Sequence, residues 1–292
     1  MFRAIAIILS LLAAVALAFG AQFQNDSVEK NAEKIAGSKR GVSLGNLVQL
    51  LRNPRWLGGM SFLVGGALCQ ITALTMAPLI VVQPIGALAL VITSLLNARS
   101  TKTKITKPTW VAIALCSGGI FTFVTIATGI ASEQRVLSDS NLIILLVIVS
   151  VIVAGFASIF FATRKKATAL MYILGAGILY GFVATFIKTV IQRIYQSHFE
   201  WLTIACVLAA IGAVSLGGWF VQNAYASGPP DLVIAGLTVI DPMVAVSIGI
   251  VVLGEAANAS SFILVVFALS GAVAALGVWL LSRVHPELQE SN

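Results

Sequence analysis

Two ionisable side chains stand inside long apolar stretches of this sequence, Lys188 and Asp241. An Asp at the centre of a membrane-spanning helix costs about 2.5–3.5 kcal/mol on an insertion scale, so it is expected to face the protein interior or a water-filled cavity. A carboxylate in such a place is suited to contacting a cation or to coupling transport to protons. The alternative is that Asp241 only hydrogen-bonds backbone loosened by Pro242, which removes one helix donor.

Lys188 has two interpretations. Its long side chain could snorkel to the outer headgroups of a bilayer. Alternatively, its ammonium group faces a cavity, where it would pair with Asp241 or hold an anionic group of a substrate. At 1.5 Å per residue Lys188 lies roughly 11 Å outward of the centre of its span, so a direct pair with Asp241 requires a kink or an intervening water.

A short pattern that carries further polar groups occurs twice. In each copy a Gln comes eight residues before a Pro, an apolar run follows, and a polar residue with a second Pro interrupts that run: Gln70, Pro78, Gln83 and Pro84, then Gln222 (with Asn223 beside it), Pro230, Asp241 and Pro242. Interrupted apolar helices at matching positions of two halves point to the binding site of a transporter. The four prolines are therefore predicted to break helices. The amides are predicted to hydrogen-bond between helices or to line a substrate path.

The rest of the chain supplies the helices that would hold these groups in a membrane. Of its 292 residues, 59% are hydrophobic and 10% are charged, too few charges to cover a soluble surface. Apolar stretches of about 17–25 residues, the length that crosses a bilayer as a helix, are predicted at Ala4–Phe23, Trp56–Met76, Leu79–Leu96, Thr109–Ile130, Asn141–Ala162, Ala169–Ile191, Trp201–Ala224, Leu232–Leu253 and Ser260–Leu281. The first stretch also resembles a signal peptide.

The basic residues predict how these spans are oriented. Most of the 18 Lys and Arg residues fall in loops on one side, namely Lys30, Lys34, Lys39, Arg40, Arg52, Arg55, Arg99, Lys102, Lys104, Lys107, Arg164, Lys165, Lys166 and Arg283. The other side has Arg3, Arg135 and Arg193. Because basic residues gather on the cytoplasmic side, we expect a protein of the cytoplasmic membrane with its N-terminus outside and its C-terminus in the cytoplasm. The same placement accounts for the net charge of +7 without a nucleic-acid partner.

The repeated pattern sorts the nine spans as four, one and four. Residues 1–130 form the first repeat, with a cytoplasmic loop at 24–55 whose part from Val42 to Leu51 is predicted to lie on the membrane surface or to act as a lid. Residues 131–167 hold a connecting helix, and residues 168–292 form the second repeat and a C-terminal tail. An odd connector makes the repeats cross the membrane in opposite senses, an arrangement that builds alternating access. The predicted fold class is an all-α integral membrane protein with nine helices as 4+1+4 inverted repeats.

Three stretches resemble a known family. They are residues 77–88, which read APLIVVQPIGAL, then Gly181 followed by Lys188, and residues 222–226, which read QNAYA and lead to Pro242 and Glu255. These stretches are similar to the drug/metabolite transporter (DMT) superfamily and, within it, to the NIPA-type magnesium transporter family. The resemblance implies a DMT-like fold and transport of Mg²⁺. The chain has Asp241 where the family has a neutral hydroxyl residue.

These observations favour a secondary transporter or permease that moves a small solute by alternating access. A transporter of Mg²⁺ or another divalent cation is one alternative, and a non-transporting scaffold or lipid-handling helper is another. An enzyme is not expected, because both His198 and His285 lie outside the spans and no Gly-rich phosphate loop occurs. No cofactor is expected, with H⁺ or Mg²⁺ as the coupling ion. The expected partners are membrane lipids, the small solute or cation, and further copies of the chain in a homo-oligomer.

Two further features receive structural interpretations. Glu255, at the outer end of the eighth span, is predicted to be solvated. Gly177 and Gly181 are spaced as a GxxxG motif, which lets two helices approach closely, and we expect it to pack helices within the bundle.

Overall fold

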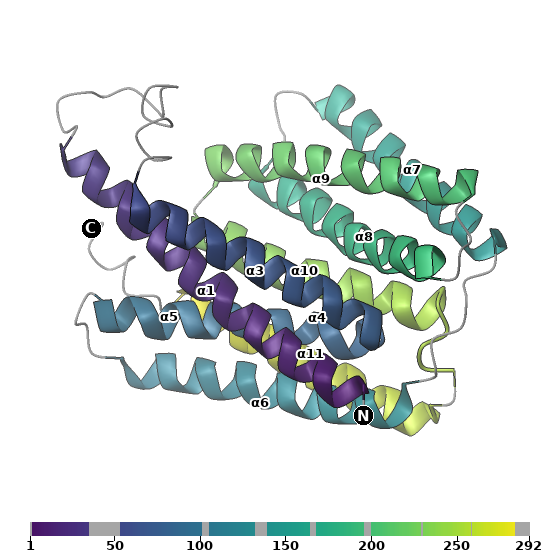
Figure 1. The fold of residues 1–292 in the computed structure, drawn as a ribbon, viewed down its shortest axis with the longest axis horizontal. Helices are drawn as coiled ribbons and strands as arrows, with labels where there is room; N and C mark the ends of the chain where they lie inside the picture. Colours follow the sequence, from purple (N-terminus) through teal and green to yellow (C-terminus); the bar gives the residue numbers. More distant parts are fainter. Residues whose placement is uncertain are drawn as a thin grey trace.

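The computed structural model describes residues 2–34, 53–100, 105–131, 139–163, 168–195, 200–228, 230–257 and 259–283. Within these ranges the chain forms helices that lie side by side along the longest dimension of the molecule (Figure 1). They are α1 (Phe2–Lys34), α3 (Pro54–Met76), α4 (Leu79–Gly86), α5 (Leu88–Ser100), α6 (Lys107–Ile130), α7 (Asp139–Thr163), α8 (Ala169–Tyr195), α9 (Trp201–Ser227), α10 (Pro230–Val251) and α11 (Ser261–Arg283). The predicted surface stretch from Val42 to Leu51 and His198 lie outside the described residues.

The predicted membrane spans are confirmed in the described part of the chain. Nine helical segments there are long and apolar enough to cross a bilayer: Phe2–Gln24, Pro54–Met76, Leu79–Ser100, Lys107–Ile130, Asp139–Phe156, Ala169–Tyr195, Trp201–Ser227, Leu232–Val251 and Ser261–Arg283. The first span ends at Gln24, where the predicted cytoplasmic loop begins, and α1 continues beyond it as a helix to Lys34. Residues 24–34 contain no Gly or Pro, and the Glu and Lys among them favour helix.

The two prolines predicted to interrupt spans behave differently. α4 ends two residues after Pro84, and α5 begins at Leu88, so the third span is divided as predicted. By contrast, α10 runs unbroken with Pro242 inside it, so the break predicted there is wrong. A Pro removes one backbone donor, but helix breakers are tolerated in membrane helices whose neighbours satisfy the freed carbonyl.

The other two prolines of the repeated pattern stand where helices begin. Pro78 is the N-cap residue of α4, and Pro230 is the first residue of α10. A Pro is well placed in the first turn of a helix, because its missing N–H has no partner there in any case. Both therefore separate helices, as the sequence predicted.

The short helix α4 lies at the centre of the bundle. Leu79, Ile80, Val81 and Val82 are completely buried, and α4 contacts α1, α6 and α10. Its side chains form one hydrophobic cluster with residues of α3, α5, α6, α10 and α11, while a second cluster joins α7, α8, α9 and α10. The element divided by Pro84 is thus surrounded by both halves of the chain.

One end of the bundle is marked by Arg3. Its guanidinium donates hydrogen bonds to the carbonyl oxygens of Thr128 (3.0 Å) and Ala131 (2.8 Å), which joins the start of α1 to the end of α6. α1 and α3 run antiparallel, because Gly59 of α3 lies against Gly20 and Gly66 lies against the earlier part of α1. The end of α3, and with it the turn at Pro78, therefore lies at this same end, which we call the Arg3 end.

The two halves meet most closely where α6 crosses α11. A Cβ atom added at Gly277 of α11 would overlap the backbone nitrogen of Cys116 in α6, and one added at Gly119 would come within 2.5 Å of the nitrogen of Ala274. Only glycine permits helix backbones to approach so closely. This crossing leaves no room for a side chain between the two helices.

Gly277→Ala is expected to lower the free energy of unfolding by about 1–3 kcal/mol, because the new methyl group can be accommodated only by moving one backbone away from the other. Gly118→Ala is the matched control, because a Cβ at Gly118 meets no atom within 4 Å. SDS titrations of the purified proteins in mixed micelles measure both changes. Equal stability of the two variants would contradict the close crossing.

Candidate functional site

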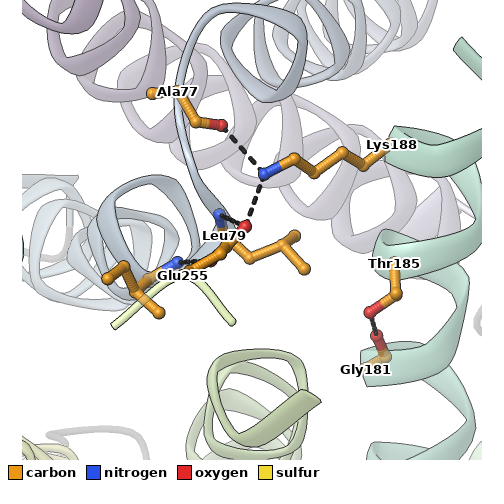
Figure 2. A network of polar contacts seen from close by, with 7 residues as sticks. Ala77, Leu79, Gly181, Thr185, Lys188 and Glu255 are labelled. Atoms are coloured by element: carbon orange, nitrogen blue, oxygen red, sulfur yellow. Dashed lines mark hydrogen bonds and ion pairs between the residues drawn. The ribbon is translucent and has the colours of Figure 1, made fainter. Parts of the chain in front are cut away.

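Lys188 forms a buried ion pair at the Arg3 end of the bundle. Its Nζ lies 2.6 Å from Oε1 of Glu255 and donates a second hydrogen bond of 3.3 Å to the carbonyl oxygen of Ala77 (Figure 2). The Lys188 side chain is 2% exposed. Lys188 therefore does not snorkel to the headgroups, and its ion-pair partner is Glu255 rather than Asp241, so both of those interpretations are wrong.

Glu255 binds the start of α4 as well as Lys188. Its Oε1 accepts a hydrogen bond from the backbone N–H of Leu79 (2.9 Å), and its Oε2 accepts one from the N–H of Ile80 (3.0 Å). These are among the first N–H groups of α4, which have no partner within the helix. The positive end of the helix dipole also favours a carboxylate there. The prediction that Glu255 is solvated is wrong, since the residue is 5% exposed.

A tight turn after α10 brings Glu255 to this place. The backbone N–H of Glu255 donates to the carbonyl oxygen of Gly249 (2.9 Å), so the chain folds back on the last turn of α10. Gly254 has φ +64°, a left-handed conformation that strongly favours glycine. One sequence signal for this contact was available: Pro78 has no side chain able to cap α4, so an acceptor had to come from another part of the chain.

Asp241 lies in the interface between α10 and α8. Its backbone nitrogen is 3.5 Å from the position of a Cβ at Gly177 in α8. Among the described residues, three buried side-chain oxygens have no hydrogen-bond partner: Gln70 Oε1, Thr189 Oγ1 and Asp241 Oδ1. Buried polar atoms without a partner are rare in proteins, and such atoms commonly bind a water molecule or an ion.

The GxxxG motif packs helices within the bundle, as expected. A Cβ at Gly177 would come within 2.6 Å of Ile240, and a Cβ at Gly181 would come within 2.7 Å of Val244. These contacts set α8 directly against α10. Thr185 and Lys188 continue the same face of α8 toward the Arg3 end, at the helical spacing of three and four residues.

A cavity of about 290 Å³ lies between α4, α6, α10 and α11. Pro84 and Pro242, the inner prolines of the two copies of the sequence pattern, both line it, as do Phe123 and Phe267. Its walls are almost entirely apolar. Asp241 is not among the lining residues, so the structure brings the two prolines together at this cavity but not the carboxylate.

The amide side chains do not gather in one place. Gln83 is buried in α4 and Gln70 is partly buried in α3, whereas Gln222 is exposed on α9. Asn223 donates a hydrogen bond to the carbonyl oxygen of Trp219 in its own helix (2.7 Å). The expectation of a bond between helices is therefore wrong for Asn223.

A second ionic cluster joins the ends of α7, α8 and α9 and includes no residue of the first half of the chain. Arg193 of α8 pairs with Asp139 (2.7 Å) and with Glu200 (3.3 Å), and its Nε donates to Thr203. Asp139 is 60% exposed, so this pair is solvated in a way that the Lys188 pair is not. In the described ranges, no group of three or more His, Cys, Asp or Glu side chains is placed to hold a metal ion.

Nine apolar spans within the described ranges define a multi-pass membrane protein. The third of these spans is divided into the short buried helix α4 and the helix α5, and a divided span of this kind is typical of transporters. The family described as "Magnesium transporter NIPA" matches residues 3–205. The chain belongs to the NIPA magnesium transporter family, as its motifs suggested, and this membership supports a membrane transporter.

A relative whose own function is not described is similar over most of its length. An uncharacterized protein of Corynebacterium glutamicum is 28% identical over 258 residues, which cover 86% of this chain and 85% of that protein. No solved structure matches the chain.

Proposed function

We propose that the protein carries Mg²⁺ or another divalent cation across the membrane, with Asp241 as a cation-contacting residue. The observation that carries this proposal is the buried Oδ1 of Asp241, which has no hydrogen-bond partner among the described residues. Mg²⁺ is bound by oxygen atoms and keeps several of its waters, so one or two carboxylates serve it better than a complete protein cage. Membership of the NIPA family supports the same cargo.

Transport is proposed to proceed by alternating access between two inverted repeats. The helix contacts support this, because the pairing of α1 with α3 in the first half matches that of α8 with α9 in the second. In the same way, α1 contacts α4 and α5, the two parts of the third span, as α8 contacts α10. The fourth and ninth spans, α6 and α11, pack against each other across the halves. Such repeats alternate access by rocking around a site at their interface.

Uptake into proteoliposomes tests the proposal. Purified protein is reconstituted around a Mg²⁺-sensitive dye, and a Mg²⁺ gradient is applied with and without a proton gradient, using protein-free liposomes as the control. We expect dye signal only with protein, and a change in rate with the proton gradient if H⁺ is the coupling ion. No Mg²⁺ uptake in either condition, from protein that elutes as a single species in detergent, would contradict cation transport.

A small organic solute is the second candidate, favoured by the apolar cavity that Pro84 and Pro242 line. The same vesicles loaded with labelled amino acids and organic ions distinguish it from a divalent cation. If no solute moves, a scaffold or lipid-handling role takes its place. We also propose that the protein lies in the cytoplasmic membrane and associates with further copies of itself. The distribution of basic residues supports an orientation in which the Arg3 end faces outward.

A further inference from the structure

Three segments from the two halves meet at the Pro78 turn. The α3–α4 junction belongs to the first half, whereas Lys188 of α8 and Glu255, after α10, belong to the second. The ammonium group of Lys188 bridges the carboxylate of Glu255 and the carbonyl of Ala77, and the carboxylate in turn holds the first N–H groups of α4 (Figure 2). These contacts fasten one half to the other at a single end of the bundle.

We propose that the Lys188–Glu255 pair is the gate that closes the transport path at the Arg3 end. Directly beneath it, one turn along α8, Thr185 is completely buried, and its hydroxyl donates to the carbonyl of Gly181 in the same helix. Separation of Lys188 from Glu255 would free the second half from the Pro78 turn and open a route from the Arg3 end to this face of α8. The inference rests on the proposed transport function, but its test requires no transported ion.

The chemistry of the pair suits a contact that must open and close. A buried ion pair contributes little net stability, because desolvation of both charges offsets most of their attraction, and apolar side chains would hold two helices together as well. An ion pair differs in that both of its groups are readily hydrated once separated. The positive end of α4 gives Glu255 a defined position in the closed state. A different contact between the halves, the α6–α11 crossing, is built on the close glycine contacts described above and is suited to act as a pivot.

The carboxylate of Glu255 packs closely against the backbone of α10 at Gly249. A Cβ at Gly249 would lie 2.6 Å from Oε2 of Glu255. The atom in conflict is the end of a flexible side chain, so Gly249→Ala would displace the carboxylate while leaving the helices in place. This variant perturbs the gate without removing either charge.

Labelling of a cysteine at position 185 tests the gate. The native Cys69, Cys116 and Cys206 are replaced by Ala, Thr185→Cys is introduced, and a membrane-impermeant maleimide is added to intact cells and, separately, to inverted vesicles. We expect slow labelling with the gate residues intact. Lys188→Met, Glu255→Gln and Gly249→Ala are each expected to raise the labelling rate several-fold, from one side of the membrane only.

Asp139→Asn and Gly118→Ala are the matched controls. The first removes an ion pair that does not join the two halves, and the second adds a methyl group in open space. Neither should change the labelling of residue 185. Labelling that stays slow in Gly249→Ala and in either folded charge variant would overturn the proposal, as would an equal rise from both sides, which would indicate loosening of the whole bundle. Absence of Mg²⁺ uptake by the native protein would leave this result unaffected.

Discussion

Glu255→Gln is expected to lower the free energy of unfolding by about 3–5 kcal/mol, the usual effect of removing one partner from a buried ion pair. The amide keeps the shape of the side chain, and its single oxygen replaces two acceptor atoms that now serve Leu79, Ile80 and Lys188. The ammonium group of Lys188 then remains buried with only neutral acceptors in this network, the carbonyl oxygen of Ala77 and the new amide oxygen. A buried ammonium group without a carboxylate partner destabilises the folded state.

Lys188→Met is expected to cost less than Glu255→Gln. With the ammonium group gone, the carboxylate of Glu255 still accepts hydrogen bonds from two backbone N–H groups at the start of α4. The helix dipole adds about 0.3–1 kcal/mol in favour of a negative charge there. Loss of the lysine should therefore lower the free energy of unfolding less than loss of the glutamate. Comparing the two values shows which charge depends more on its partner.

The double variant Lys188→Met/Glu255→Gln completes the measurement. Its loss of stability should be clearly smaller than the sum of the two single losses, because no unpaired charge remains. Unfolding in SDS mixed micelles gives all three values, with Asp139→Asn as a solvated pair whose loss should cost at most about 1 kcal/mol. Strictly additive losses would show that Lys188 and Glu255 do not interact in the folded protein.

The sequence predicted the spans well because hydrophobic length is a local property. Each span could be found from about twenty consecutive residues, and the division of the third span at Pro84 followed from the chemistry of proline. The same reasoning failed at Pro242, where neighbouring helices rather than the local sequence decide whether a helix continues. Local rules do not include such neighbours.

The ion pair could not be predicted by the same means. Lys188 and Glu255 belong to different segments, and each had a reasonable local environment: the outer headgroups for one and water for the other. Their meeting depends on the reversal of the chain at Gly254 and on the crossing of α8 with α10, which Gly177 and Gly181 permit. Only the orphan N–H groups after Pro78 indicated that an acceptor had to arrive from elsewhere.

Asp241→Asn is expected to reduce Mg²⁺ uptake by roughly tenfold or more, equivalent to the loss of about 1.4 kcal/mol of cation binding, without lowering the stability of the fold. The substitution keeps the size of the side chain and removes its charge. Oδ1 of Asp241 has no hydrogen-bond partner to lose among the described residues, so the fold should be as stable as before or more stable. A purely structural role of the carboxylate predicts the opposite pattern, a loss of stability with unchanged uptake by the folded protein. Uptake in proteoliposomes and unfolding in micelles, measured on the same preparation, separate the two roles.

Ser247→Ala provides the matched control for Asp241→Asn. Ser247 lies on the same helix and lines the cavity, but its hydroxyl is already bonded to the carbonyl of Met243 in its own helix (2.7 Å). Its loss should leave uptake unchanged. If Asp241→Asn transports Mg²⁺ as fast as the native protein, the carboxylate is not a cation contact, and Glu255 becomes the remaining described acid buried among the spans that could meet the ion. In that case Lys188 would have to release Glu255 before a cation could bind, and Lys188→Met would change uptake more than Asp241→Asn does.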